Sequence, residues 1–306
     1  MNHALAESFA HCRRIARREA RNFYYSFLVL PRPERRAMCA LYAFLRATDD
    51  IADQPGPAAE QRARLDGWRR GLEATLQGRY NHPAQAALHH TVTAYGIPAE
   101  LLSSVLDGVQ MDLQARRYES FNDLYVYCYR VASVVGRACI RIWGYTAEKA
   151  EQYAEWYGIA FQLTNILRDL AEDARQGRVY LPSEDLERFE YTAEDLAAAK
   201  CDERFLRLMQ FEAGRAREYY DRARPLFGLI HPAGRAVLKA MVGIYLGILD
   251  EIERRRYDVF SGRVELSRIR KTVIALGALP ARFFGPASGT VDLPARYGGR
   301  PRQMVP

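Results

Sequence analysis

The stretch from residue 157 to 182, YGIAFQLTNILRDLAEDARQGRVYLP, combines a helical period with two faces of opposite character. At 3.6 residues per turn, its polar side chains fall within roughly 80° of one another; they are Gln162, Asn165, Asp169 and Asp173, with Glu172 beside them. The apolar side chains point the other way, and these are Ile159, Leu163, Ile166, Leu167 and Leu170. Any solvated amphipathic helix shows the same two faces, so the pattern predicts a helix and needs a second observation to indicate a function.

A second acidic helical segment lies upstream, at Arg46-Ala-Thr-Asp49-Asp50-Ile-Ala-Asp53. Asp49 and Asp53 are one turn apart, on the side of the helix that Arg46 and Tyr42 share. Like charges at this spacing repel each other in an isolated helix, so two such clusters in one chain suggest a divalent cation between them. Oxygen ligands suit Mg²⁺, which keeps several waters and shares its coordination with substrate phosphates. The implied substrate is a diphosphate.

Three motifs in this order resemble the squalene/phytoene synthases, the head-to-head prenyltransferases. They are the acidic segment, the run YCYRVASVVG at 127–136, and residues 162–182. The resemblance covers residues 20 to 260 and implies an all-α, single-domain helical bundle around a central cavity, of the class I isoprenoid synthase type. It also implies a Mg²⁺-dependent condensation of two prenyl diphosphates, with Mn²⁺ as a substitute metal.

The same resemblance assigns the site residues. The implied metal ligands are Asp49, Asp53, Asn165, Asp169 and Asp173. The implied substrate-binding residues are Ser26, Phe27, Tyr42, Arg46, Tyr127, Gln162, Asn165, Arg168, Arg178 and Tyr245. The residues expected to act in catalysis are Tyr127, Arg46, Arg168, Asp49, Asp53, Asp169 and Asp173. Guanidinium groups suit this role because they bind phosphate oxygens bidentately.

Several of these residues also have a purely structural interpretation. Tyr245 lies on an apolar helix, and the aromatic run around Ser26 and Phe27 is equally typical of a core. The small residues Ala132, Ser133 and Gly136 thin one side of the predicted Tyr127 helix, which predicts room for a hydrocarbon chain against the backbone.

The wording of the motifs is closest to the bacterial hopanoid-pathway presqualene diphosphate synthases, which predicts condensation of two farnesyl diphosphates to presqualene diphosphate, feeding squalene and hopanoid synthesis. Phytoene synthase acting on two geranylgeranyl diphosphates is the alternative. Tyr157 stands where the family more often has an aliphatic residue, and this difference affects the expected length of the cavity. A squalene synthase using NADPH and a non-catalytic helical assembly factor are further alternatives. Two intact acidic clusters argue against the last, and the absence of a G-x-G-x-x-G motif or a clear basic loop predicts no NAD(P)H. Basic residues late in the chain are expected on a solvated helix face: Arg263, Arg268, Arg270 and Lys271.

Elsewhere the chain shows helical periods with little period-two alternation. The expected helices cover residues 33–53, 58–77, 83–95, 98–114, 120–143, 147–174, 202–224, 233–258 and 266–279. Prolines and glycines mark their starts and ends; these are Pro33, Pro83, Pro98, Gly78, Gly96 and Gly144. The helical prenyltransferase domain is expected at 1–284, and a disordered tail rich in Gly, Pro and Arg at 285–306.

The net charge of +7 does not indicate nucleic-acid binding, because the arginines are dispersed among acids and no aromatic-basic motif occurs. A basic surface that faces anionic lipid or diphosphates fits as well. The five cysteines have no metal-binding spacing, and their odd number argues against a disulfide framework. The run 236–252 is too short and too charged for a confident membrane span. The expected location is the cytoplasm, peripherally at the inner membrane face, with downstream squalene-forming enzymes as partners.

Overall fold

The computed structural model describes residues 3–19, 22–113 and 117–282, without the side chains of Asn22, Phe23, Tyr25, Ala52, Asp53 and Arg282. Every regular element in these ranges is helical, apart from one isolated β-bridge between Tyr145 and Ile230. The predicted all-α fold is confirmed. The tail expected at 285–306 lies outside the described residues.

The elements that form the body of the molecule are α1 (His3–Glu19), α3 (Arg32–Asp53), α4 (Ala58–Leu76), α5 (Gln85–Tyr95), α6 (Ala99–Asp112), α8 (Val134–Trp143), α9 (Lys149–Arg175), α12 (Glu203–Ala223), α14 (Pro232–Arg254) and α15 (Arg268–Ala278). Shorter helices connect them, namely α2 (Asn22–Phe27), α7 (Phe121–Cys128), α10 (Ser183–Arg188), α11 (Ala193–Ala197) and α13 (Leu226–Leu229). A π-helical turn, η1 (Tyr129–Ser133), joins α7 to α8, and a 3₁₀ turn, η2 (Leu279–Arg282), follows α15.

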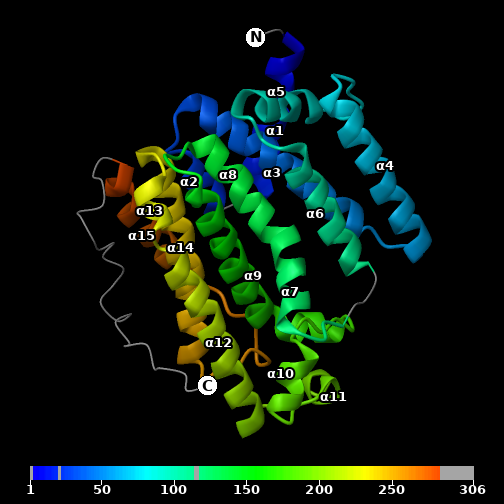
Figure 1. Ribbon diagram of the computed structural model, residues 1–306, viewed down its shortest axis with the longest axis vertical. Helices are drawn as coiled ribbons and strands as arrows, with labels where there is room; N and C mark the ends of the chain where they lie inside the picture. Colours follow the sequence, from blue (N-terminus) through cyan, green and yellow to red (C-terminus); the bar gives the residue numbers. More distant parts are fainter. Residues whose placement is uncertain (1–2, 20–21, 114–116, 283–306) are drawn as a thin grey trace.

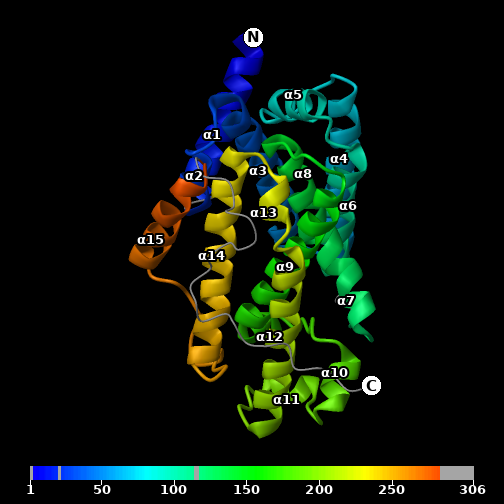
Figure 2. The ribbon, with the colours of Figure 1, turned by 60° about the vertical axis from the view of Figure 1, so that its left-hand side comes forward.

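Helix α9 is the axis of the bundle. Figures 1 and 2 show it in the middle, with α12 and α14 along one side and α7 and α8 along the other. Its apolar side chains, including Ile159, Leu163 and Ile166, are at most 3% exposed. Burying branched side chains of this size is worth about 1.5–3 kcal/mol each, so this face fixes the rotation of α9 in the fold.

The predicted helices are all present, and most of their ends agree with the structure within about two residues. The exception is the helix predicted for 233–258, which ends at Arg254. Arg256 and Tyr257 have φ of 52° and 63°, left-handed values that cannot continue a right-handed helix. Gly96 and Gly144 close α5 and α8 with φ of 57° and 79°, as expected of glycine after a helix.

The predicted helix at 120–143 contains the π turn η1, and its small residues serve close packing. A Cβ atom added to Gly158 of α9 would lie 2.4 Å from the Cα of Ser133, and one on Gly136 would lie 3.0 Å from the Ala154 carbonyl oxygen. Ser133 Oγ also donates a hydrogen bond to the Glu155 carbonyl oxygen at 2.8 Å. The room predicted for a hydrocarbon chain at Ser133 and Gly136 is therefore occupied by α9.

Replacing Gly158 with Ala should destabilise the fold, because the new methyl group meets the backbone of η1 rather than a side chain that can move. We expect a loss of about 1–3 kcal/mol, or more, in the free energy of unfolding measured by urea denaturation. Gly214→Ala on α12 is the matched control, since nothing lies within 4 Å of its added Cβ. That variant should be neutral or more stable by up to about 1 kcal/mol, because Ala favours helix. Equal stability of the two variants would contradict the packing described here.

In the described part of the chain, α14 is the single helix long and apolar enough to cross a membrane, and 61% of its most apolar window is buried in the fold. Its buried residues include Val237, Leu249 and Ile252. Such burial is typical of the core helix of a globular bundle.

Candidate active site

The polar face predicted on residues 157–182 lies on α9, and its residues are half-buried: Gln162, Asn165, Asp169 and Asp173. Leu167 and Leu170, on the opposite face, are each 1% exposed. The same burial that anchors α9 thus holds its oxygen-bearing side chains in one direction.

Asp169 is the point where two arginines meet. The neighbouring Arg168 donates from Nε to Asp169 Oδ1 at 2.9 Å and makes a second contact with Oδ2. Arg263, which lies between α14 and α15, is 3.2 Å from Asp169 Oδ1 and 3.8 Å from a carboxylate oxygen of Glu172. The expectation that Arg263 belongs to a solvated helix face is corrected, because α15 begins only at Arg268 and the preceding loop returns to α9.

Asp112, the last residue of α6, joins two tyrosines that are far apart in the sequence. Tyr127 Oη donates to Asp112 Oδ2 at 3.1 Å, and Tyr180 Oη donates to Oδ1 at 2.9 Å. The two rings stack with their centroids 5.1 Å apart, and Tyr118 stacks on Tyr180 at 6.0 Å. Burial and the charge of Asp112 raise the pKa of Tyr127 well above its usual range, so its hydroxyl group stays protonated.

Sequence reasoning predicted Tyr127 and missed the other members of this cluster. Asp112 ends a largely apolar helix and has no acid four residues before it, so it lacks the i, i+4 repetition that drew attention to the two acidic clusters. Tyr180 lies inside the Gly-Arg-x-Tyr-x-Pro segment at 177–182, and this was the one available signal.

Asp173 connects this cluster to Asp169. Burial and the negative charge of Asp169 together raise the pKa of Asp173 to about 7, although the positive charge of Arg178 opposes both effects. Burial lowers the pKa of Arg178, but the charges of Asp112 and Asp173 and a hydrogen bond with Tyr180 raise it more. Arg178 therefore stands between the two acids.

The upstream acidic cluster lies at the end of α3. Asp49 and Asp50 are exposed, and Arg46 Nη2 is 2.5 Å from Asp50 Oδ1, a partner that sequence reasoning did not select. Burial raises the pKa of Tyr42, while the charge of Arg46 opposes this shift. The structure thus brings Tyr42, Arg46 and Asp49 together as predicted. The side chain of Asp53, the last residue of α3, lies outside the described part of the chain.

The remaining predicted residues form a second layer. Asn165 Nδ2 donates to Gln162 Oε1 at 3.4 Å, and Asn165 also hydrogen-bonds Tyr245. The ring of Tyr245 packs at a tilt against Phe161, with 4.6 Å between centroids. Tyr245 is partly buried, and its hydroxyl group reaches the polar face of α9. Ser26 and Phe27 are 6% and 4% exposed in α2, which packs against α14 and α15.

The oxygen atoms on α9 have the chemistry of a Mg²⁺ site. Asn165 Oδ1 is buried and has no hydrogen-bond partner in the described part of the chain, and Asp169 and Asp173 repel each other without a cation between them. Among the described residues, no three His, Cys, Asp or Glu side chains gather closely enough to form a metal cluster alone. This arrangement fits Mg²⁺, which takes one or two carboxylates and completes its shell with water and substrate phosphate.

Comparison with known protein families gives a match over most of the chain. A sequence model of the squalene/phytoene synthase family matches residues 16–270. The 15-cis-phytoene synthase of Synechococcus elongatus is 38% identical over 283 residues, covering 88% of this chain and 91% of the relative. Phytoene synthase 1, chloroplastic, of Arabidopsis thaliana is 35% identical over 285 residues, covering 91% of this chain and 67% of the relative.

Solved structures show the same fold. A dehydrosqualene synthase crystallised with a ligand superposes with a TM-score of 0.81 at 28% identity, covering 90% of this chain and 96% of the other. The squalene synthase HpnC from Alicyclobacillus acidocaldarius gives a TM-score of 0.79 at 29% identity, with coverages of 84% and 97%.

These comparisons correct the predicted reaction. The expectation of a presqualene diphosphate synthase acting on farnesyl diphosphate is wrong, because curated relatives at 34–38% identity over most of the chain are named phytoene synthases. Their names agree with the alternative drawn from the sequence. The motifs around Tyr127 and Asn165 are common to both enzymes, so their wording did not separate the two.

Proposed function

The chain belongs to the squalene/phytoene synthase family, and we propose that it joins two geranylgeranyl diphosphates head to head to form phytoene. The two substrates would lose their diphosphate groups, and the product would be a hydrocarbon. The names of the relatives support the substrate, and the residues on α9 and α6 support the chemistry. The non-catalytic alternative has no support, since the matched relatives are named as synthases.

The observation that carries the proposal is one continuous charged network. It runs from Arg263 and Arg168 through Asp169 to Asp173, and from there through Arg178 to Asp112 and the two tyrosines. Residues from α6, α7, α9 and two loops meet in it. A site that must hold acids for a metal and arginines for a leaving group needs this combination.

The residues of this network and the other predicted site residues each have a role in the proposed reaction. When bound by Asp49, Asp53, Asn165, Asp169 and Asp173, Mg²⁺ supplies electrostatic stabilisation of the charge that develops on the diphosphate. Arg168, Arg178 and Arg263 donate hydrogen bonds to the departing diphosphate as the allylic C–O bond breaks. Arg46 would bind the second diphosphate from α3, beside Tyr42. Gln162 and Tyr245 position Asn165.

The carbocation left by this step is attacked by the double bond of the second substrate, and loss of a proton closes a cyclopropane. We assign this proton to the hydroxyl oxygen of Tyr127, whose own proton moves to Asp112 along the 3.1 Å hydrogen bond. A second ionisation followed by another proton loss gives phytoene. Because both stages end in loss of a proton, no hydride donor is needed, and we propose that the reaction uses no NADPH.

A product assay tests the substrate. Purified protein with Mg²⁺ should convert geranylgeranyl diphosphate to phytoene, identified by mass spectrometry, and should do so at the same rate with and without NADPH. Farnesyl diphosphate should give at least about tenfold less product, because a chain that is five carbons shorter buries less apolar surface in the site. A preference for farnesyl diphosphate, or squalene formed in proportion to NADPH consumed, would refute the proposal.

We also propose that the protein acts at the cytoplasmic face of a membrane without spanning it. Helix α15 exposes an apolar stripe, with Ile269 at 78%, Val273 at 62% and Leu276 at 60% exposure. Arg268 and Arg270 flank this stripe and are also exposed. A helix with this pattern lies in the lipid interface, where cations contact anionic headgroups. Transfer of the product to squalene-forming enzymes was expected only for a presqualene diphosphate product, so we do not propose these partners.

A further inference from the structure

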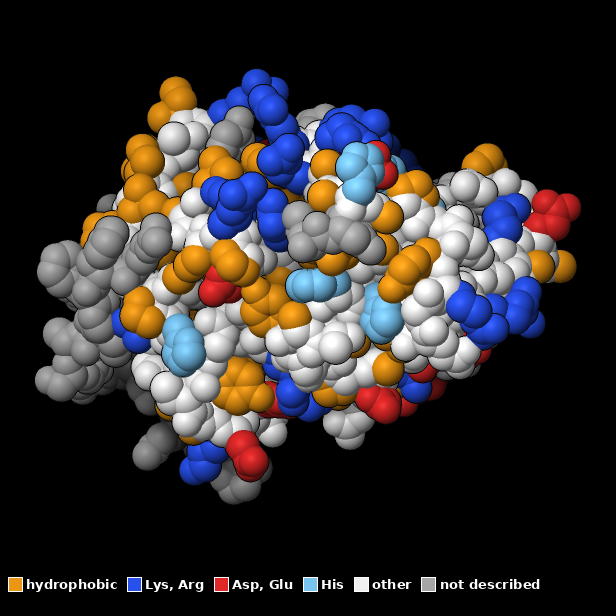
Figure 3. All heavy atoms as spheres, turned by 90° about the horizontal axis from the view of Figure 1, so that it is seen from above, with side chains coloured by type: hydrophobic (Ala, Val, Ile, Leu, Met, Phe, Trp, Pro, Cys, Tyr) orange, Lys and Arg blue, Asp and Glu red, His pale blue; other side chains and the backbone are white. Residues whose placement is uncertain are grey.

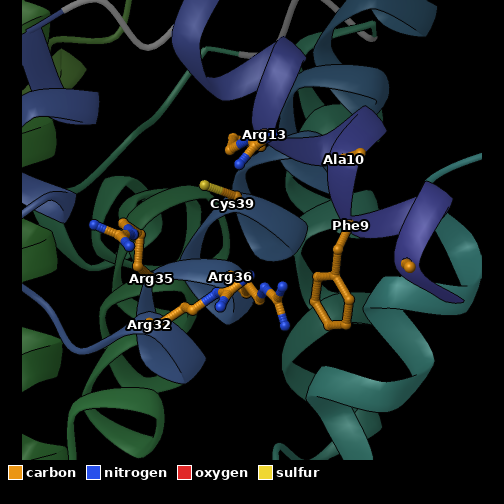
Figure 4. Close-up of a pocket in the computed structure, with 8 residues that line it drawn as sticks. Phe9, Ala10, Arg13, Arg32, Arg35, Arg36 and Cys39 are labelled. Atoms are coloured by element: carbon orange, nitrogen blue, oxygen red, sulfur yellow. The ribbon is translucent and has the colours of Figure 1, made fainter. Parts of the chain in front are cut away.

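A cavity of about 200 Å³ lies where α1 crosses the beginning of α3, and arginines dominate its lining. Arg13 comes from α1, and Arg32, Arg35 and Arg36 come from α3. Figure 4 shows Cys39 between Arg13 on one side and the arginines of α3 on the other. Figure 3 shows Lys and Arg side chains gathered on this end of the molecule, with hydrophobic side chains among them.

Three of the four arginines that line this cavity have no acidic partner in the described part of the chain. Arg13, Arg32 and Arg35 form no ion pair within the described part of the chain, and Arg36 lies over the ring of Phe9 at 5.9 Å from its centroid. Glu34, the acidic residue of the first turn of α3, is not among the lining residues.

The clustering of these arginines is unfavourable for an isolated helix, for two electrostatic reasons. Arg32, Arg35 and Arg36 are spaced i, i+3 and i+4, so their like charges share one helix face and repel each other. They also stand at a helix N-terminus, where the backbone dipole favours anions and disfavours cations. Burial raises the pKa of the Cys39 thiol to about 11, while Arg35 and Arg13 oppose this shift, so both guanidinium groups act on the same point. A bound anion would relieve this repulsion.

An apolar groove of about 750 Å³ adjoins the cavity, between α1, α3 and α5. Its lining includes Leu5, Pro33, Ala37 and Tyr95, and it shares Phe9, Arg32 and Arg36 with the arginine cavity. The two spaces together therefore place cations beside an apolar channel. This combination recognises an amphiphile that has a phosphate headgroup and a hydrocarbon chain.

This place is remote from the candidate active site. Arg32 and Asp49 stand near opposite ends of α3, about 25 Å apart at 1.5 Å per residue. We propose that the arginine cavity is a second binding site, for a diphosphate group, and that the adjoining groove takes a prenyl chain attached to it. The diphosphate has two sources, a prenyl diphosphate or the free anion, and the groove favours the prenyl diphosphate. This proposal does not depend on the proposed reaction.

Calorimetric titration of the full chain in EDTA tests the site, because the arginine cavity needs no metal. The probes are inorganic diphosphate, geranylgeranyl diphosphate and geranylgeraniol, which has no charge. The double variant Arg13→Gln/Arg35→Gln removes two charges from the cavity, and Ala94→Trp fills the groove at an exposed position. Arg62→Gln/Arg70→Gln, at exposed positions of α4, is the matched control for net charge. Thermal unfolding of each variant checks that the fold is retained.

We expect the Arg13/Arg35 double variant to bind geranylgeranyl diphosphate about tenfold more weakly, or worse, as follows from the loss of charged hydrogen bonds, while the α4 control binds normally. Ala94→Trp should weaken binding of geranylgeranyl diphosphate and leave inorganic diphosphate unchanged. Inorganic diphosphate that binds as tightly as the prenyl diphosphate would identify the free anion as the source and support the arginine site. Equal affinities in the double variant and its control would overturn the proposal, as would geranylgeraniol binding as well as the diphosphates.

Discussion

Replacing Asp169 or Asp173 with Ala should lower kcat by about 10²-fold or more, because each change removes a carboxylate from the proposed metal site, which would stabilise charge on the departing diphosphate. The same loss is expected for Asp49→Ala and Asp53→Ala on α3. The measurement is the initial rate of phytoene formation from geranylgeranyl diphosphate at saturating Mg²⁺. EDTA should abolish activity of the unaltered protein, and added Mg²⁺ should restore it, with Mn²⁺ as a substitute.

The fold should survive these changes. Replacing Asp173 with Ala removes the charge repulsion between Asp173 and Asp169. Asp173→Ala should therefore not lower the melting temperature. Asp221→Ala is the control for loss of an acid, since Asp221 is 69% exposed on α12 and pairs only loosely with Arg224, at 3.5 Å. Near-normal turnover by Asp169→Ala, or activity that persists in EDTA, would count decisively against the proposed role of these residues.

The second large effect is expected at Asp112. Asp112→Asn keeps the shape of the side chain but removes the charge that accepts hydrogen bonds from Tyr127 and Tyr180 and that faces Arg178. Hydrogen bonds to a charged group contribute about 1.5–3 kcal/mol each, so losing such support should lower kcat by about 10²-fold. KM for geranylgeranyl diphosphate should change much less than kcat, because Asp112 would act on the proton and on Tyr127 and would not touch the prenyl chain.

Tyrosine variants separate the two hydrogen bonds that Asp112 accepts, one from Tyr127 and one from Tyr180. Tyr127→Phe removes the hydroxyl group that is assigned to proton transfer, whereas Tyr180→Phe removes a second donor to the same carboxylate. We expect Tyr127→Phe to reproduce most of the Asp112→Asn defect and Tyr180→Phe to cause a smaller one. If Asp112 and Tyr127 act as a unit, their double variant should be no slower than the worse single variant. Full turnover by Tyr127→Phe would remove Tyr127 from the mechanism.

Much of this site was predictable from local sequence because it lies on one helix. The spacing of Gln162, Asn165, Asp169 and Asp173 places them on one face in any α-helix, and the opposite apolar face requires that the polar one point away from the core. The ends of several helices were also predictable from local sequence, because glycines such as Gly96 adopt φ values that other residues rarely take.

The choice between presqualene diphosphate and phytoene was beyond these patterns. It depends on the length of the prenyl chain, which is set by the shape of an apolar space. Tyr157 is 2% exposed, and its ring packs against Phe161, Tyr220 and Phe227 from three helices. The spacing of residues within one helix does not indicate the volume of a space whose walls are side chains far apart in the sequence.

The sequence by itself determined most of the long helices, the two-faced character of α9 and the acidic residues around which we propose a diphosphate site, because each of these follows from spacing within one helix. Only the tertiary structure decided that Asp112 joins Tyr127 to Tyr180, that Arg263 returns to Asp169, and that Arg13 meets the arginines of α3. These partners lie on different elements, and their encounter depends on how whole helices pack. Small residues such as Gly158 set that packing by allowing two backbones to touch, which is a property of the pair of helices and of neither sequence alone.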